Sequence, residues 1–219
     1  MTNRAFDLIV FDWDGTLIDS TALIAGSVQL AAADVGLPVP SDEDAKHIIG
    51  LGLLQAMTWL FPGLNPEQYQ ALIERYRLHY LKRDSEIALF SNVRELLIGL
   101  RKDGYLLAVA TGKARQALDR ALLQADLAKY FDSTRCADET FSKPHPQMLL
   151  ELIDELMVEP ARVLMVGDTT HDLQMAANAG TAALAVTCGA HPNEVLRSEP
   201  HLAMLPDVSG LREWLRGGQ

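Results

Sequence analysis

The sequence predicts a doubly wound α/β protein, in which helices cover both faces of a parallel sheet. Short apolar runs alternate along the chain with segments of helical periodicity, and this alternation is typical of such sheets. A long stretch between the first two runs has helical patterns only, which indicates an insertion. The expected strands are residues 6–11, 106–110, 162–166 and 181–186, with a weaker candidate at 133–136.

Residues with turn and capping preferences mark the ends of the expected core helices. Asn92 is expected to cap a helix over residues 93–103, which closes at Gly104. Asp172 is expected to begin another helix, which closes at Gly180. These helices follow strands in regular order and therefore support the doubly wound prediction.

The insertion predicts a four-helix cap. Ser41 and Asp44 have the spacing of a capping box, and Asn65 precedes Pro66 as an N-cap precedes a proline in the first helical turn. An insertion after the first strand lies above the carboxyl ends of the strands, where open α/β sheets bind ligands. The two expected units are a Rossmann-like core of residues 1–18 and 85–219 and a helical cap domain of residues 19–84.

Composition restricts the partners and the compartment. The chain of 219 residues has a formal net charge of −10, which argues against nucleic acid or an anionic membrane as its main partner. Cys136 and Cys188 stand far apart and outside any CxxC pattern. The apolar stretch near the N-terminus is too short for a signal peptide. We expect a cytoplasmic monomer or homodimer.

Two carboxylates follow the first expected strand directly. Asp12 and Asp14 stand two residues apart, so their side chains start on the same side of the chain. A bare Asp-x-Asp more often ends a strand as an acidic turn than it performs catalysis. Gly15 and Thr16 come next, and together with the later motifs they favour chemistry at this position.

Polar groups near the ends of later strands are placed to line the same cleft. Thr111 and Gly112 precede a helix, so a hydroxyl and backbone N–H groups can bind a phosphate there. Lys143 lies in a loop whose prolines disfavour helix. Asp168 and Asp172 add two carboxylates, and Asp172 also fits an N-cap. Each signal is weak alone, because Thr-Gly turns and solvated lysines are common.

Together, in this order, these residues resemble the four motifs of the haloacid dehalogenase superfamily, in the subfamily whose helical cap follows the first motif. The sequence looks like a member of the phosphoglycolate phosphatase type. The resemblance covers essentially the whole chain, including residues 129–132 and 176–180. Dehalogenases of this superfamily lack the second aspartate of the first motif. Because this chain has Asp14, the resemblance implies a phosphatase.

The resemblance also implies a role for each motif residue. Asp12 is the nucleophile and forms an aspartyl phosphate, while Asp14 protonates the leaving alkoxide and then activates water. Thr16 is expected to hold Asp14 through a hydrogen bond. Lys143 is expected to offset the charge on Asp12. The groups implied to bind the transferring phosphoryl oxygens are Lys143, Thr111 and the Gly112 N–H.

The acidic residues require a cation if they meet. Two carboxylates about 4 Å apart repel by about 4 kcal/mol at an effective dielectric constant near 20. Mg²⁺ suits a site of carboxylates, water and substrate phosphate. The resemblance assigns to Mg²⁺ the Asp12 carboxylate, the Asp14 backbone carbonyl and Asp168, with Asp172 in or just behind the ligand set. A small phosphorylated metabolite is the expected substrate.

Two alternative functions use similar residues. A phosphomutase passes the same aspartyl phosphate to another hydroxyl when its cap excludes water. Its cap loop normally carries a basic residue, but the corresponding loop here, residues 49–55, has no cation. A phosphoacceptor signalling module also combines an acidic cluster with a threonine and a lysine. Asp14 and the large cap favour turnover over storage of the phosphoryl group.

Two conspicuous residues near the motifs receive simpler interpretations. Lys113 is expected to be a surface charge. His171 is expected to be exposed, or to lie behind the site without taking part in catalysis.

Overall fold

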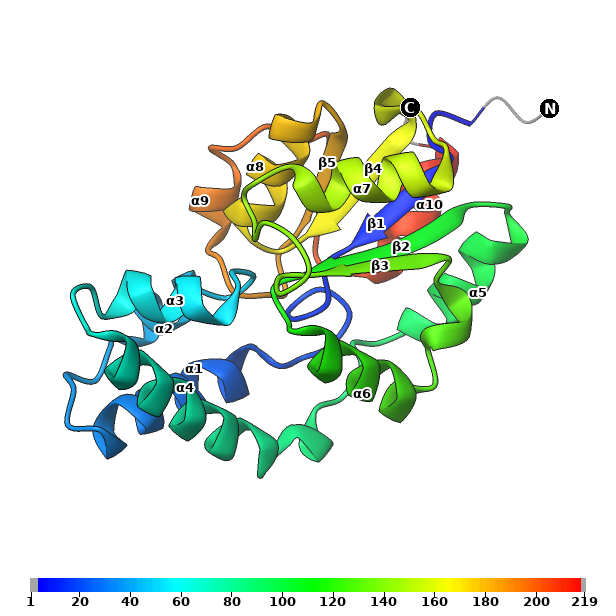
Figure 1. Ribbon diagram of the computed structural model, residues 1–219. Helices are drawn as coiled ribbons and strands as arrows, with labels where there is room; N and C mark the ends of the chain where they lie inside the picture. The colour runs from blue at the N-terminus through cyan, green and yellow to red at the C-terminus, as the bar shows by residue number, and fades with distance from the viewer. Residues whose placement is uncertain (1–3, 218–219) are drawn as a thin grey trace.

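The computed structural model describes residues 4–217 and contains one six-stranded parallel sheet in the order β3-β2-β1-β4-β5-β6. β1 lies in the middle of the sheet, between β2 and β4 (Figure 1). This is the arrangement in which the strand order reverses beside β1, and the reversal opens a crevice at the carboxyl ends of the strands. The strands are β1 (Leu8–Phe11), β2 (Leu106–Thr111), β3 (Ser133–Cys136), β4 (Val163–Gly167), β5 (Ala182–Val186) and β6 (Met204–Leu205).

The predicted α/β class and all five expected strands are confirmed, whereas β6 was not expected. β6 has only two residues and pairs with the end of β5, with Ala185 opposite Met204. A strand of this length carries too little periodicity to be recognised in the sequence.

Helices cover both faces of the sheet, and a further group of helices lies beyond its carboxyl edge (Figure 1). Within residues 4–217 the structure has no helix long and apolar enough to cross a membrane. The helices are α1 (Thr21–Asp34), α2 (Asp42–His47), α3 (Leu53–Leu60), α4 (Pro66–Leu81), α5 (Val93–Lys102), α6 (Arg115–Ala125), α7 (Gln147–Leu156), α8 (Thr170–Ala179), α9 (Asn193–Leu196) and α10 (Leu211–Gly217).

Alternation along the strands divides the core into two layers. Ile9 and Phe11 of β1 pack in one cluster with α5, α6 and α10. Leu8 and Val10 pack in the other cluster with α7, α8 and α9. Because successive side chains of a strand point to opposite faces, a continuous apolar run is what a strand buried on both faces requires.

The four inserted helices, α1 to α4, have an apolar cluster of their own. It includes Val28 of α1, Met57 of α3 and Leu72 of α4, all fully buried. Both expected N-cap residues are present at helix starts. The Ser41 side chain accepts a hydrogen bond from Asp44 N, and the Asn65 side chain accepts one from Gln68 N. In Figure 1 these helices form a separate layer facing the loops that follow the strands.

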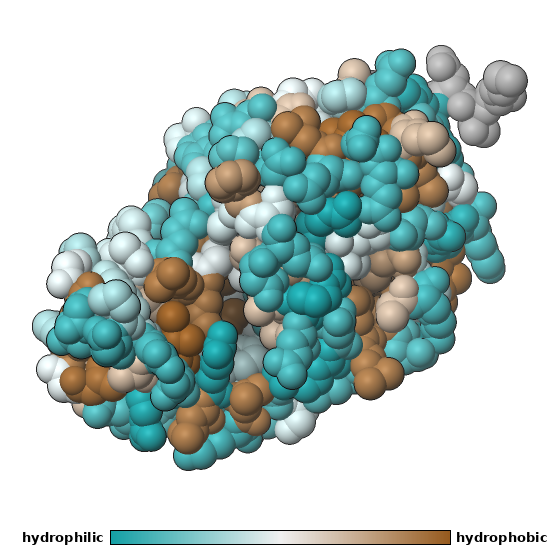
Figure 2. Space-filling view, in the orientation of Figure 1, coloured by the Kyte–Doolittle hydropathy of each residue, from teal (hydrophilic) through white to brown (hydrophobic). Residues whose placement is uncertain are grey.

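Two chain segments connect the inserted helices to the sheet, and they lie side by side. Asp19 N donates to Ala88 O at 2.9 Å, and Phe90 N donates to Leu17 O at 3.0 Å. Figure 2 shows the surface hollowed between the inserted helices and the core. A cavity of about 390 Å³ lies near these connections, lined in part by Trp13, Tyr80, Asp84 and Arg120.

Of the two N-cap predictions for the core helices, that of Asn92 is confirmed in position and that of Asp172 is wrong. Asn92 stands at the N-cap of α5 but has a left-handed backbone, with φ of 63°, and its side chain makes no capping hydrogen bond. Asp172 is the third residue of α8, and Thr169 is its N-cap. Thr169 and Asp172 form a reciprocal capping box, so Asp172 supports the helix start from inside the helix.

Candidate active site

The sequence motifs meet at the carboxyl edge of the sheet. Asp12 directly follows β1, and its backbone N–H donates to Val166 O of β4 at 2.9 Å. Asp168 directly follows β4, while Thr111 is the last residue of β2. These strands are neighbours in the sheet, so the parallel register carries each polar group to the same edge.

Lys143 joins two of the carboxylates. Its Nζ lies 2.6 Å from Asp12 Oδ1 and 2.6 Å from Asp172 Oδ1, and all three side chains are fully buried. The other oxygen of Asp172 accepts hydrogen bonds from Thr169 N and Oγ1. The loop that contains Lys143 therefore delivers a cation to the middle of the sheet edge, although the residue lies 131 positions from Asp12.

Asp168 is held by groups other than the lysine. Thr16 Oγ1 donates to Asp168 Oδ1 at 2.7 Å, and Ala190 N donates to Asp168 Oδ2 at 2.7 Å. The expectation that Thr16 holds Asp14 is thus wrong, because its hydroxyl is used by Asp168. Gly15, with φ of +82°, packs so closely on Asp168 that a side chain at this position would overlap the carboxylate.

Burial and mutual repulsion raise the pKa of two carboxyl groups. Burial, followed by the charges of Asp172 and Asp168, raises the pKa of Asp12 well above its ordinary value, and the charge of Lys143 only partly opposes this. Burial and the Asp172 charge raise the pKa of Asp168 to about 7. Burial alone would lower the pKa of Lys143, but Asp12 and Asp172 outweigh it and keep the ammonium charged.

The donor set fits a divalent metal ion. Asp12, Asp168 and Asp172 each offer one oxygen within 4.8 Å of the others, and all three are buried. Asp12 Oδ2 is buried without a hydrogen-bond partner. Three carboxylates facing one ammonium carry two uncompensated negative charges when ionised, and hard oxygen donors suit Mg²⁺. A divalent cation would balance this charge and satisfy the oxygen that lacks a partner.

Asp14 has a different set of partners. Its Oδ1 accepts a hydrogen bond from Ser20 Oγ at 2.6 Å and lies 3.0 Å from Lys113 Nζ. The ammonium also donates to Tyr80 Oη at 3.0 Å. The expectation that Lys113 is a surface charge is therefore wrong, because its side chain is 9 % exposed and paired with Asp14. Burial would lower the pKa of Lys113, but the Asp14 charge and two tyrosines, Tyr80 and Tyr76, raise it.

The cap loop lies against the core residue expected to bind phosphate. A side chain at Gly112 would overlap the carbonyl oxygens of Leu51 and Gly50. Gly52 N donates to Ser142 Oγ at 2.7 Å, beside Lys143. Thr111 is fully buried, and its Oγ1 accepts a hydrogen bond from Lys113 N at 3.2 Å. The insertion thus closes over the sheet edge in the described structure.

Three histidines hold the cap against the core. Nε2 of His171 lies 2.8 Å, and Nε2 of His191 3.0 Å, from the backbone oxygen of His47. Nδ1 of His191 accepts from Thr170 N, which makes Nε2 of this ring the donor. The His171 side chain is buried, which excludes the expected exposed position and agrees with the alternative that it lies behind the site.

Sequence reasoning missed several contacts that complete the site. Ser20, Tyr80 and Ala190 lie outside the four motifs, and each binds a motif residue or Lys113. A serine six residues after Asp14 carries no recognisable signal, and Tyr80 belongs to a different unit. All three contacts therefore depend on how the chain folds.

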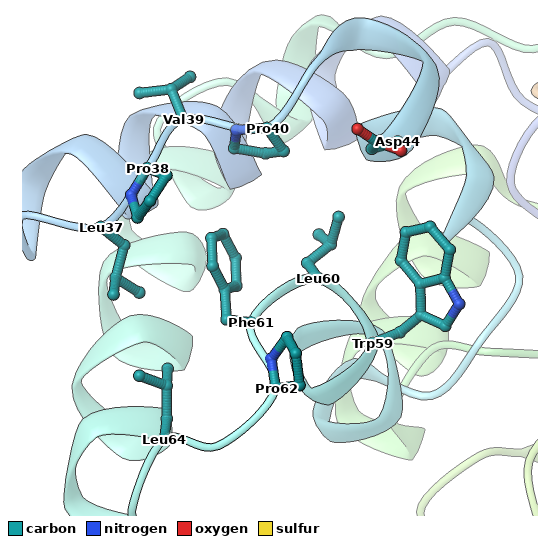
Figure 3. A pocket seen from close by; sticks show the side chains of 10 residues that line it. All are labelled: Leu37, Pro38, Val39, Pro40, Asp44, Trp59, Leu60, Phe61, Pro62 and Leu64. Carbon is teal, nitrogen blue, oxygen red and sulfur yellow. The ribbon is translucent and has the colours of Figure 1, made fainter.

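A second cavity, of about 450 Å³, belongs to the inserted helices alone. Figure 3 shows the side chains that line it, which are apolar except for Asp44. Trp59 and Phe61 belong to its wall, and none of the acidic triad does. This cavity therefore contains no group suited to phosphate chemistry.

Comparison with known proteins agrees with this geometry. A family model described as “Haloacid dehalogenase-like hydrolase” matches residues 9–186, which include all the residues of the acidic cluster and Lys143. A solved structure titled as a predicted phosphoglycolate phosphatase from Haemophilus somnus superimposes with a TM-score of 0.81 at 27 % identity, covering 96 % of this chain and 98 % of that chain.

Two curated relatives match most of the chain. “Probable phosphatase IndB” of Dickeya dadantii is 36 % identical over 201 residues, covering 89 % of this chain and 87 % of the relative. “Phosphoglycolate phosphatase” of Vibrio vulnificus is 32 % identical over 224 residues, covering 95 % of this chain and 98 % of the relative.

Proposed function

This chain belongs to the haloacid dehalogenase-like hydrolase family, and from that premise we propose that it is a Mg²⁺-dependent phosphatase of the phosphoglycolate phosphatase type. Its proposed substrate is a small phosphate monoester, hydrolysed through an aspartyl phosphate on Asp12. The relatives named as phosphatases support this reaction class. The separate apolar cluster of the inserted helices supports a catalytic core with a cap over residues 19–84, which closes on the substrate.

One observation carries the proposal. Asp12 Oδ2 is buried without a protein partner, in a cluster that already holds Lys143, Asp168 and Asp172. A fold rarely buries an unpaired carboxylate oxygen, because desolvation of the charge is unfavourable. Such an oxygen, placed beside a cation at a ligand-binding sheet edge, is suited to bind metal and to attack an electrophile.

The residues proposed to hold Mg²⁺ are the carboxylates of Asp12 and Asp168, the backbone carbonyl of Asp14 and, at or just behind the ligand set, Asp172. When bound, Mg²⁺ supplies positive charge that offsets the repulsion between the substrate phosphate and the acidic cluster. The closeness of the three carboxylates supports this assignment.

In the first proposed step, a carboxylate oxygen of Asp12 forms a bond to phosphorus while the ester P–O bond breaks. Asp14 donates its proton to the departing oxygen, so the leaving group departs as an alcohol. Lys143, 2.6 Å from Asp12, neutralises charge beside the nucleophile. The Thr111 hydroxyl and the Gly112 N–H are proposed to bind the phosphoryl oxygens.

In the second proposed step, the Asp14 carboxylate takes a proton from water, and the water oxygen attacks phosphorus. The bond between phosphorus and Asp12 breaks, which releases inorganic phosphate and returns both aspartates to their starting states. Ser20 keeps the Asp14 side chain in place through its hydrogen bond of 2.6 Å. The same group thereby serves as acid and then as base.

The test is Mg²⁺-dependent hydrolysis of a panel of small phosphate esters by the wild-type protein and by Asp12→Asn. We expect the wild-type protein to release inorganic phosphate, and a chelator to abolish this activity. The activity of Asp12→Asn should fall to the background of the assay, because an amide cannot form the acyl phosphate. Asp154→Asn is the matched control, since Asp154 is an exposed carboxylate on α7, outside the motifs. A folded wild-type protein without activity on the whole panel would refute the proposal.

A further inference from the structure

Two buried lysines lie in or beside the acidic cluster, and they have different partners. Lys143 faces two carboxylates, Asp12 and Asp172, at 2.6 Å each. Lys113 faces one carboxylate, Asp14, while its other polar contact is the neutral phenol of Tyr80. Lys143 therefore has its charge more than balanced, whereas Lys113 is balanced by Asp14 alone and is left with an unopposed charge when Asp14 carries the proton that it is proposed to donate.

The position of Lys113 relates it to the leaving group. Asp14 is the residue proposed to protonate the departing oxygen, and Lys113 Nζ lies 3.0 Å from Asp14 Oδ1. The Lys113 ammonium would thus stand within about two hydrogen-bond lengths, roughly 6 Å, of the ester oxygen. An anionic group within a few bonds of the ester oxygen could therefore contact the ammonium.

The walls around Lys113 come from the cap. Tyr80 lies on α4, and the Lys113 ammonium stands 4.8 Å from the centre of its ring, while Tyr76 stacks on Tyr80. The neighbouring residue Gly112 touches the carbonyls of Gly50 and Leu51. The cap loop of residues 49–55 supplies no cation. The positive charge near the leaving group is therefore supplied by a core residue, Lys113, and aromatic and apolar residues of the cap cover it.

We propose that Lys113 is a specificity-determining residue that binds an anionic group carried by the leaving group of the substrate. This inference rests on the proposed phosphatase function. The anionic group that Lys113 recognises is a carboxylate or a phosphate within a few bonds of the scissile P–O bond. Binding such a group draws the ammonium partly away from Asp14, which keeps its hydrogen bond with Ser20. A charge-assisted contact of this kind favours the anionic substrate by at least about tenfold in kcat/KM.

The test compares paired substrates whose leaving group either carries or lacks an anionic group. Phosphoglycolate is set against its carboxamide analogue, and pyrophosphate is set against methyl phosphate, so the two pairs separate a carboxylate from a phosphate as the recognised anion. The variants are Lys113→Met and Lys113→Gln, both checked for folding by circular dichroism. Lys129→Met is the control, because Lys129 is an exposed lysine paired with Asp126.

In the wild-type protein and the control we expect at least one anionic substrate to exceed its neutral partner by about tenfold or more. Both Lys113 variants should lower that ratio toward one. A role confined to positioning Asp14 would reduce kcat/KM for charged and neutral substrates alike, leave the ratio unchanged and overturn the inference. Inactivity of the wild-type protein on every ester would instead refute the proposed function itself.

A measurement on the wild-type protein keeps the inference testable even if the variants fold poorly. Glycolate and glycolamide are compared as inhibitors of the hydrolysis of a generic aryl phosphate. Stronger inhibition by glycolate, by about tenfold, supports an anion site on the leaving-group side. Equal inhibition by the two compounds, together with equal turnover of the charged and neutral substrates, would overturn it.

Discussion

Asp12 and Asp14 stand two residues apart but have different surroundings. Asp12 is enclosed by Lys143 and two further carboxylates, whereas Asp14 contacts Ser20 and Lys113. The fully buried Trp13 separates them, so the chain sends the two carboxylates to different partners. Two chemically identical groups can then perform different tasks, because the charges and hydrogen bonds around each set its role.

Asp14→Asn tests this division of roles. We expect kcat to fall by about 100-fold or more, because the amide can neither donate the required proton nor act as a base. The rise in Tm on addition of Mg²⁺ should remain close to that of the wild-type protein, since the backbone carbonyl of this residue is unchanged. Phosphate release and thermal unfolding are the measurements, and a variant that keeps more than about a tenth of the wild-type kcat would contradict the assignment.

At the scale of elements, the loop between α2 and α3 is one of the contacts between the inserted helices and the core. Gly50 packs on Thr169 and His171, and Gly52 is bound to Ser142. The absence of side chains at these glycines allows the backbones of cap and core to approach closely. Closure of this contact would exclude water from the site until the leaving group has departed.

Gly112→Ala is expected to impair closure of the cap. The added methyl group would overlap the Leu51 carbonyl oxygen, so the loop must move away from the site. We expect kcat/KM to fall by at least about tenfold, because small displacements of positioned groups reduce rates strongly. Substrate kinetics and the Mg²⁺-induced change in Tm provide the two readouts, and the second should stay unchanged.

Gly26→Ala is the matched control for this glycine. Gly26 lies inside α1 with open space around the position of the new methyl group. Alanine in a helix interior should raise the free energy of unfolding by up to about 1 kcal/mol without changing kcat/KM. Equal kinetics for the two alanine variants would show that cap closure does not depend on Gly112.

At the scale of the whole molecule, the acidic cluster lowers the stability of the metal-free protein at neutral pH. Burial and the charge of Asp172 raise the pKa of Asp168 to about 7, above its ordinary value of 3.8. Between these values the folded state binds more protons than the unfolded state, so stability falls as pH rises through this window. The ionised carboxylates at the sheet edge therefore repel one another, and a bound cation would offset this repulsion.

Mg²⁺ should consequently raise Tm more at pH 8 than at pH 6. At the lower pH, protons on Asp168 compete with the metal, whereas at the higher pH the carboxylates are ionised and free to bind it. Thermal unfolding with and without saturating Mg²⁺ at both pH values is the measurement. Asp168→Asn should reduce the shift at each pH, and a larger shift at pH 6 than at pH 8 would contradict this account.

The sequence by itself determined the fold class and the motif residues that gather at the sheet edge. Apolar runs indicated β1, β2, β4 and β5, because strands buried on both faces need such runs, whereas β3 was a weaker candidate and β6 was not expected. Asp12, Asp168 and Lys143 were recognisable as a set, since parallel strands bring their carboxyl ends to one edge. These features are local in the chain, and local patterns can be read without coordinates.

Tertiary structure alone decided which partners each of these groups has. Thr16 binds Asp168, 152 residues away, rather than its neighbour Asp14. Lys113 is buried against Asp14 and Tyr80, which belong to different units of the chain. A lysine has the same sequence signature at the surface and in a buried ion pair, because its environment depends on how the cap packs against the core. The charge balance at the site is therefore a property of the folded molecule.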